Sequence, residues 1–127
     1  MYIRFVTAEL NAQSGEPTGI FTALYALERR GALTSDELSW FREVEAWFNS
    51  HLNRPGRLAW SRRPHAPERA VTWLKASARE HVSRMRGLVS LLQHKDIRVE
   101  ELRTERPGYI LYEDDHQVAA IPFAETP

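Results

Sequence analysis

The sequence predicts a single α+β domain with helices packed on one face of a small, mostly antiparallel sheet. Three observations predict this class: a β-branched and aromatic run at residues 2–7, apolar residues at helical spacing through the middle of the chain, and three short strand-like segments after residue 96. A chain of 127 residues, 43% of them hydrophobic, is long enough to bury one core. The expected order is β-α-α-α-β-β-β, forming one domain over residues 1–127.

The first strand is expected at residues 2–7 and the first helix at residues 19–30. Tyr-Ile-Arg-Phe-Val-Thr is rich in the residue types that favour strands. In the helix, apolar residues recur at helical spacing, namely Ile20, Leu24 and Leu27. Two arginines and Gly31 end it, because cations suit a helix C-terminus and glycine accepts the left-handed conformation that follows.

Thr34 and Glu37 predict the start of a second helix. Their spacing is that of a capping box, in which each side chain bonds the backbone N–H of the other residue. The helix carries one apolar stripe with Trp40 and Trp47 along its margin. The stripe consists of Leu38, Phe41, Val44, Phe48 and Leu52. We expect this helix to be anchored in the core.

A long third helix is expected from residue 67 to residue 94. It follows a loop at residues 53–66 that prolines and a glycine keep from being helical, and Pro67 suits a first helical turn. Its apolar residues repeat at steps of three and four, through Val71, Leu74, Ala78, Val82, Met85, Val89 and Leu92. This stripe predicts a helix that packs on the core.

Three strands are expected to close the chain, at residues 97–104, 108–113 and 116–123. The connections between them are short, so we expect the three to pair as an antiparallel meander. Pro122 indicates an edge position or a strand end, since proline cannot donate to a ladder.

Charge is unevenly spread along a chain whose formal net charge is zero. Residues 54–86 hold nine Lys or Arg and two acids, a balance of +7, whereas residues 1–53 balance at −3 and residues 87–127 at −4. A basic segment of this kind suits an anionic ligand. The alternative is that it pairs with the acidic segments on either side.

Composition excludes several classes. The chain has no cysteine, which excludes disulfides, thiol catalysis and Cys-ligated zinc. Its five histidines show no metal-ligand spacing, and we expect neither a metal nor another cofactor. No stretch approaches the length of a membrane span and no signal peptide is visible at Met1, so we expect a soluble, cytoplasmic protein without membrane contact.

On the expected third helix, a second band lies beside the apolar stripe. It consists of Trp73, Ser77, His81, Arg84 and Leu88. Trp stacks, Arg binds anions and His titrates near neutrality, so the band suits a phosphate or a base. The alternative is that Trp73 and Leu88 cover a loop or a partner subunit. Ser77 and His81 are too poorly placed for nucleophilic catalysis, because no strained turn or oxyanion site accompanies them.

The basic loop interleaves arginine and tryptophan, with Arg54, Arg57, Arg62 and Arg63 around Trp60 and His65. This pattern suits single-stranded nucleic acid or a nucleotide, although a solvated loop is the alternative. Residues 14–19, Ser-Gly-Glu-Pro-Thr-Gly, lie between a strand and a helix, where a phosphate could bind the helix N-terminus. They lack the P-loop pattern, and a plain loop with Thr18 as the N-cap is the alternative.

Three segments carry a resemblance. They are Ser-Gly-Glu-Pro-Thr-Gly-Ile-Phe at residues 14–21, Trp47-Phe48, and Arg-Pro-Gly-Tyr-Ile-Leu-Tyr-Glu-Asp at residues 106–114. In these segments the chain resembles a family of short uncharacterised bacterial proteins over most of its length. The resemblance implies a small, soluble, stand-alone protein and carries no activity, cofactor or site residue with it.

The leading functional hypothesis is a non-enzymatic module that binds an anionic ligand, nucleic acid included, or a protein partner through the Arg-rich loop and the third helix. The predicted binding residues are Trp60, Arg62, Arg63, Trp73, His81 and Arg84. One alternative is an enzyme for a phosphorylated or nucleotide substrate, with His81 or His65 as acid/base beside a carboxylate such as Glu9 or Glu80. Another is a regulatory or immunity-type protein with an exposed apolar patch around Trp73. A homodimer is also expected to be feasible.

Overall fold

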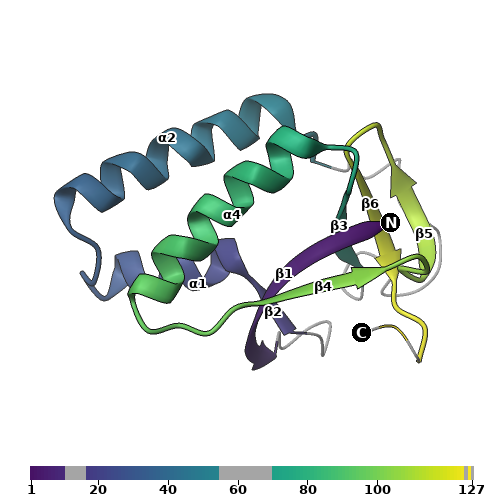
Figure 1. The fold of residues 1–127 in the computed structure, drawn as a ribbon, viewed down its shortest axis with the longest axis horizontal. Helices are drawn as coiled ribbons and strands as arrows, with labels where there is room; N and C mark the ends of the chain where they lie inside the picture. Colours follow the sequence, from purple (N-terminus) through teal and green to yellow (C-terminus); the bar gives the residue numbers. More distant parts are fainter. Residues whose placement is uncertain (11–16, 55–69, 125, 127) are drawn as a thin grey trace.

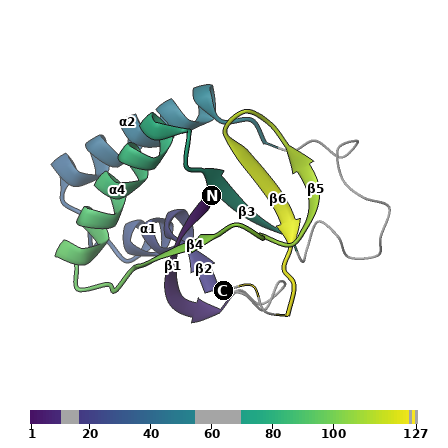
Figure 2. The same ribbon diagram turned by 45° about the vertical axis from the view of Figure 1, so that its right-hand side comes forward.

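The structure is a computed structural model that describes residues 1–10, 17–54, 70–124 and 126. Within these ranges it has three helices and one six-stranded sheet, which confirms the α+β class. In both ribbon views the helices gather on one side of the strands (Figures 1 and 2). The elements are β1 (Tyr2–Leu10), β2 (Pro17–Gly19), α1 (Ile20–Arg29), α2 (Ser35–His51), β3 (Val71–Lys75), α4 (Arg79–His94), β4 (Glu100–Thr104), β5 (Tyr109–Glu113) and β6 (Gln117–Ile121).

The first two helices follow the sequence-based expectation. After α1, Gly31 takes a φ of 67°, in the left-handed region that glycine accepts without strain. The N–H of Ala32 then donates to the carbonyl of Leu27 at 2.9 Å. At the start of α2 the capping box is present: the Thr34 hydroxyl accepts from the N–H of Glu37 at 3.1 Å, and the Glu37 carboxylate accepts from the N–H of Thr34 at 2.8 Å.

The predicted third helix over residues 67–94 is wrong in its first part. A strand, β3, comes first, and helix α4 begins only at Arg79. In β3, Val71 and Trp73 are buried while Thr72 between them is exposed, which is the period of a strand. Valine, threonine and tryptophan fit a pleated sheet, and β6 offers the ladder that satisfies their backbone. Strand pairing therefore outweighs the helical spacing of the apolar residues.

The expected meander of the last three strands is half right. All strand pairs in the described ranges are antiparallel, and β5 and β6 form a hairpin. β4, however, pairs with β1, from Tyr2 opposite Thr104 to Val6 opposite Glu100. The physical reason is that β1 lies inside the sheet and needs hydrogen-bond partners on both edges. Pro122 follows the last residue of the inner strand β6, so it marks a strand end.

The other edge of β1 is shared by two strands, and this forks the sheet. Near its start, Tyr2 and Ile3 pair with β3, whereas Val6 pairs with Gly19 of β2. Because β4 occupies the opposite edge from Tyr2 to Val6, β2 and β3 must follow one another along the same edge. In the described ladders the pairing of β1 with β3 ends at Ile3 and its pairing with β2 begins at Val6, so β1 and β3 diverge between these two positions.

The two faces of the sheet are buried in different ways. On one face Ile3, Phe5 and Leu74 join the helices in the main core, together with Ile20, Leu24, Leu27, Phe41, Val44, Phe48, Val82, Leu88 and Leu92. On the other face Trp73 packs with Val71 and Val118 in a smaller cluster. Trp73 therefore lies on the face of the sheet that points away from the helices. No helix in the described part of the chain is long and apolar enough to cross a membrane.

Candidate ligand-binding cleft

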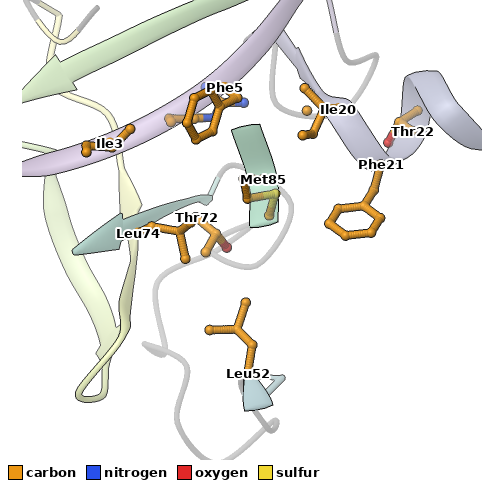
Figure 3. A pocket seen from close by; sticks show the side chains of 11 residues that line it. Ile3, Phe5, Ile20, Phe21, Thr22, Leu52, Thr72, Leu74 and Met85 are labelled. Atoms are coloured by element: carbon orange, nitrogen blue, oxygen red, sulfur yellow. The ribbon is translucent and has the colours of Figure 1, made fainter. Parts of the chain in front are cut away.

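A chamber of about 150 Å³ lies at the fork of the sheet. β1 and β3 form its walls, and the first turn of α1 closes one end. Figure 3 shows the side chains of these elements, with those of Leu52 and Met85, around one space. The lining is mostly apolar and includes Ile3, Phe5, Ile20, Phe21, Leu52, Leu74 and Met85, with Arg4, Thr22 and Thr72 as polar members. We call this space the inner chamber.

An outer cleft of about 390 Å³ adjoins the inner chamber. The two spaces share four lining residues, Phe21, Leu52, Thr72 and Met85, so they lie side by side. The outer cleft adds a polar rim, made by Tyr25, Glu45, Asn49, Asn53, Arg54 and Gln117. An apolar interior with a few polar groups at its edge is the usual form of a small-molecule site. We call the inner chamber and the outer cleft together the fork cleft.

The acidic side of the rim is already engaged within the protein. The Tyr25 hydroxyl donates a short hydrogen bond to Glu45, and Arg42 contacts the other oxygen of that carboxylate at 3.0 Å and also pairs with Glu28. Burial and this hydrogen bond raise the pKa of Tyr25. The bond from Tyr25, helped by Arg42, lowers the pKa of Glu45 against the opposing effect of burial. The negative charge of Glu45 is therefore already balanced by contacts within the protein, with Arg42 and Tyr25.

Arg54 is the basic group of the rim. It lies near enough to Tyr25 and Glu45 for its charge to act as a smaller cause on both groups: it opposes the rise in the pKa of Tyr25 and adds to the lowering of the pKa of Glu45. Among the described residues no carboxylate lies within salt-bridge distance of it. Its side chain is exposed at the outer cleft, so its charge faces solvent or a ligand.

Two side-chain donors hold the rim in place. The Gln117 amide donates to the backbone carbonyl of Asn53 at 2.5 Å, and His81 Nε2 bonds the carbonyl of His51 at 2.7 Å. Both carbonyls belong to the end of α2 or the residues just after it, on either side of Leu52. The segment that carries Leu52 and Arg54 into the cleft is therefore fixed from β6 and from α4.

The predicted helical band does not form. Trp73 is on β3 and is fully buried on the far face of the sheet, and Ser77 is in the turn before α4. Leu88, which we expected beside the core stripe, is fully buried in the main core. The exposed apolar patch expected around Trp73 is therefore not there.

His81 and Arg84 do come together, over Trp47. The His81 ring centroid lies 4.8 Å from that of Trp47 and 4.4 Å from that of His116, and the Arg84 guanidinium lies 4.3 Å from the Trp47 centroid. Arg84 also pairs with Glu80 at 3.1 Å. His81 is buried, so these contacts join α2, α4 and the turn before β6 rather than line the fork cleft.

Three of the predicted binding residues, Trp60, Arg62 and Arg63, lie outside the described residues, as does His65. Arg54 belongs to the predicted basic loop but is not among the predicted binding residues, and Thr72 carries no sequence signal for a site. The available signal for Arg54 was its position as the first arginine of the basic segment, two residues after the last apolar residue of the α2 stripe.

Part of the basic segment does pair with the acidic C-terminal third. Lys75 contacts Glu113 at 2.6 Å, and Arg86 contacts Glu101 at 3.2 Å. For these two cations the alternative that the basic segment pairs with acidic segments is confirmed. Arg54 differs from them, because it makes no salt bridge with a described residue.

A second hollow of about 320 Å³ lies between β1 and α1. It is lined by Glu9, Arg30 and Arg98 with small and apolar residues, and no histidine lines the described part of it. Within the described ranges no three His, Asp or Glu side chains are grouped to hold a metal ion.

No family model, curated protein or solved structure matches the chain. The resemblance to a bacterial family, the homodimer and the nucleic-acid and protein partners therefore stay predictions.

Proposed function

We propose that the chain is a non-enzymatic binding module whose ligand is a small molecule in the fork cleft. The proposal keeps the two elements that the sequence indicated. Arg54 begins the basic loop, and Met85 belongs to α4, which is the helical part of the expected third helix.

The proposal rests on the adjacency of the inner chamber and the outer cleft, which share four lining residues. A space of about 390 Å³ falls within the range of roughly 300–1,000 Å³ that small-molecule sites occupy. Apolar walls gain from burying an apolar group, at about 25 cal/mol per Å² removed from water. The rim then supplies the polar groups that orient a ligand.

Binding is favoured over catalysis by what lines the cleft. The enzyme hypothesis needs a histidine beside a carboxylate in one cleft. In the described part of the fork cleft the carboxylate is Glu45, which is held by Tyr25 and Arg42, and no histidine is present. His81 is buried and its Nε2 is engaged by the carbonyl of His51.

The test is a ¹⁵N–¹H NMR titration with a set of neutral and charged fragments of benzene size and larger. We expect saturable shifts that cluster on Phe21, Leu52, Thr72 and Met85. Thr72→Phe should abolish them, because Thr72 lines both spaces and a phenyl ring there would fill the volume that the ligand needs.

Thr72→Val is the matched control. It keeps the shape of threonine and should bind as the wild type does. Thr72 is exposed on a strand, where phenylalanine is well tolerated, so both variants should stay folded. Shifts that scatter over the surface, or that persist unchanged in Thr72→Phe, would contradict the proposal.

A further inference from the structure

We infer that the ligand of the fork cleft is a carboxylate with an apolar group of benzene size, and that it binds with the apolar group in the inner chamber and the carboxylate on Arg54. This inference rests on the proposed function and adds the chemical class and the orientation of the ligand.

The volume of the inner chamber determines the size of the apolar group of the ligand. An apolar cavity of about 150 Å³ takes one benzene-sized molecule. The inner chamber has this volume, and two of its walls are the rings of Phe5 and Phe21. A planar ring or a short branched alkyl group fits this volume, whereas a sugar would place most of its polar atoms against apolar walls.

The contacts that the rim residues already make within the protein indicate the charge of the ligand. Glu45 has its oxygens occupied by Tyr25 and Arg42, so it has little left for a cationic ligand. Arg54 forms no salt bridge within the described part of the chain. A guanidinium can bind a carboxylate through two parallel N–H···O bonds. Arg54 therefore favours a ligand that carries a carboxylate.

The orientation follows from the order of the two spaces. The inner chamber is the apolar space at the fork, and the polar rim belongs to the outer cleft. A ligand with the reverse orientation would bury its carboxylate among Ile3, Phe5 and Leu74, which is costly because a buried charge loses its hydration. The cation that lines this space, Arg4, donates to the backbone carbonyl of Pro17 at 2.5 Å, so it is already engaged within the protein.

The experiment measures affinities by isothermal titration calorimetry for a series of ω-phenylalkanoates, from benzoate to 5-phenylpentanoate, and for the alcohols of the same lengths. We expect the best acid to bind about tenfold more tightly than its alcohol, as charge-assisted hydrogen bonds are stronger than neutral ones. We also expect affinity to peak at one chain length, because the distance from the chamber to Arg54 is fixed.

Two arginine variants locate the charge. Arg54→Gln should lower the affinity for the best acid about tenfold and leave the matched alcohol unchanged. Arg29→Gln is the control, since Arg29 is an exposed arginine of α1 that does not line the fork cleft, and it should leave both affinities unchanged.

The outcomes separate the inference from the proposed function. If acids and alcohols bind equally, both lose affinity in Thr72→Phe, and Arg54→Gln changes neither, then the cleft binds small molecules and the carboxylate inference is overturned. If phenethyl phosphate binds more tightly than every acid of the series, the carboxylate class is overturned as well. If neither acids nor alcohols bind, the proposed function fails together with the inference.

Discussion

The side-chain amide of Gln117 donates to the backbone carbonyl of Asn53 at 2.5 Å, and this bond joins two residues that are 64 positions apart. Gln117 is 2% exposed, and the same amide nitrogen also reaches Asp114 at 3.0 Å. The bond fastens the rim of the fork cleft to the inner strand β6, so the shape of the cleft depends on a residue outside the basic segment.

Replacing Gln117 with methionine tests this bond. Methionine keeps the length of the side chain and removes its donors, so the Asn53 carbonyl and Asp114 each lose a partner. We expect the free energy of unfolding to fall by about 1–3 kcal/mol, measured by urea denaturation. Gln93→Met, at an exposed position of α4, is the control and should stay within about 0.5 kcal/mol of the wild type. Equal effects of the two variants would show that the bond does not stabilise the fold.

Replacing Trp73 with alanine tests its position in the sheet. A fully buried tryptophan leaves a large cavity when it is truncated, so the variant should lose about 3–5 kcal/mol of stability in urea denaturation. Trp40, which is 39% exposed on α2, gives the comparison, and Trp40→Ala should cost clearly less. If Trp73→Ala were as stable as the wild type, the side chain would lie on the surface, as the sequence analysis expected.

Substitution by alanine should change the stability of the protein in opposite directions at two glycines. At Gly87 in α4, a new Cβ would lie 3.3 Å from the edge of the Trp40 ring, which is partly exposed and can shift outward. Gly87→Ala should therefore gain about 0.5–1 kcal/mol, because alanine suits a helix interior better than glycine.

At Gly108 the φ is 131° and a new Cβ would lie 2.0 Å from the backbone oxygen of Ile121. Gly108→Ala should lose about 2 kcal/mol or more, because backbone has to move and the conformation is strained. Thermal unfolding of both variants measures the two effects. A loss at Gly87 as large as that at Gly108 would mean that Trp40 cannot move.

Stability should fall in acid partly through Asp114. Burial alone would raise its pKa, but hydrogen bonds from the Gln117 side chain, the His116 and Gln117 backbone and the Tyr112 hydroxyl outweigh burial and lower it. A carboxyl group with a depressed pKa in the folded state stabilises the fold above its unfolded pKa, about 3.9 for aspartate. That contribution is lost as the pH falls through the lower folded value.

Asp114→Asn should therefore be less stable than the wild type at pH 7, and the difference should shrink as the pH falls below about 4. Urea denaturation at several pH values between 7 and 3 measures this difference. Asp115→Asn, at the exposed neighbouring position, is the control and should follow the wild-type curve. A difference for Asp114→Asn that stays constant with pH would show that the charge of Asp114 does not stabilise the hairpin.

Local patterns predicted the parts of the fold that local interactions determine. The capping box at Thr34 and the glycine after α1 mark helix ends through contacts within a few residues, and both are found where expected. β3 was missed because Val71 and Leu74 satisfy helical spacing as well as strand composition. Only the neighbouring β6, more than forty residues later, decides between the two.

The fork cleft could not be read from the sequence for a related reason. Its walls come from elements far apart in the chain, and the inner chamber exists because β1 and β3 diverge after Ile3. That divergence depends on where β2 takes over the edge of β1, and no local pattern records it. Arg54 was visible as a basic residue, but its position at a cleft depends on α2 ending beside β6.

The arrangement of β1 also has a consequence for how the molecule assembles. β1 is synthesised before all the strands that pair with it, since its two edges are completed by residues 17–19, 71–75 and 100–104. Contacts between residues so distant in the chain slow folding, because loop closure must be achieved before they form. During translation Ile3 and Phe5 would stay uncovered until most of the chain has left the ribosome, and a nascent chain in that state is a natural client for a chaperone.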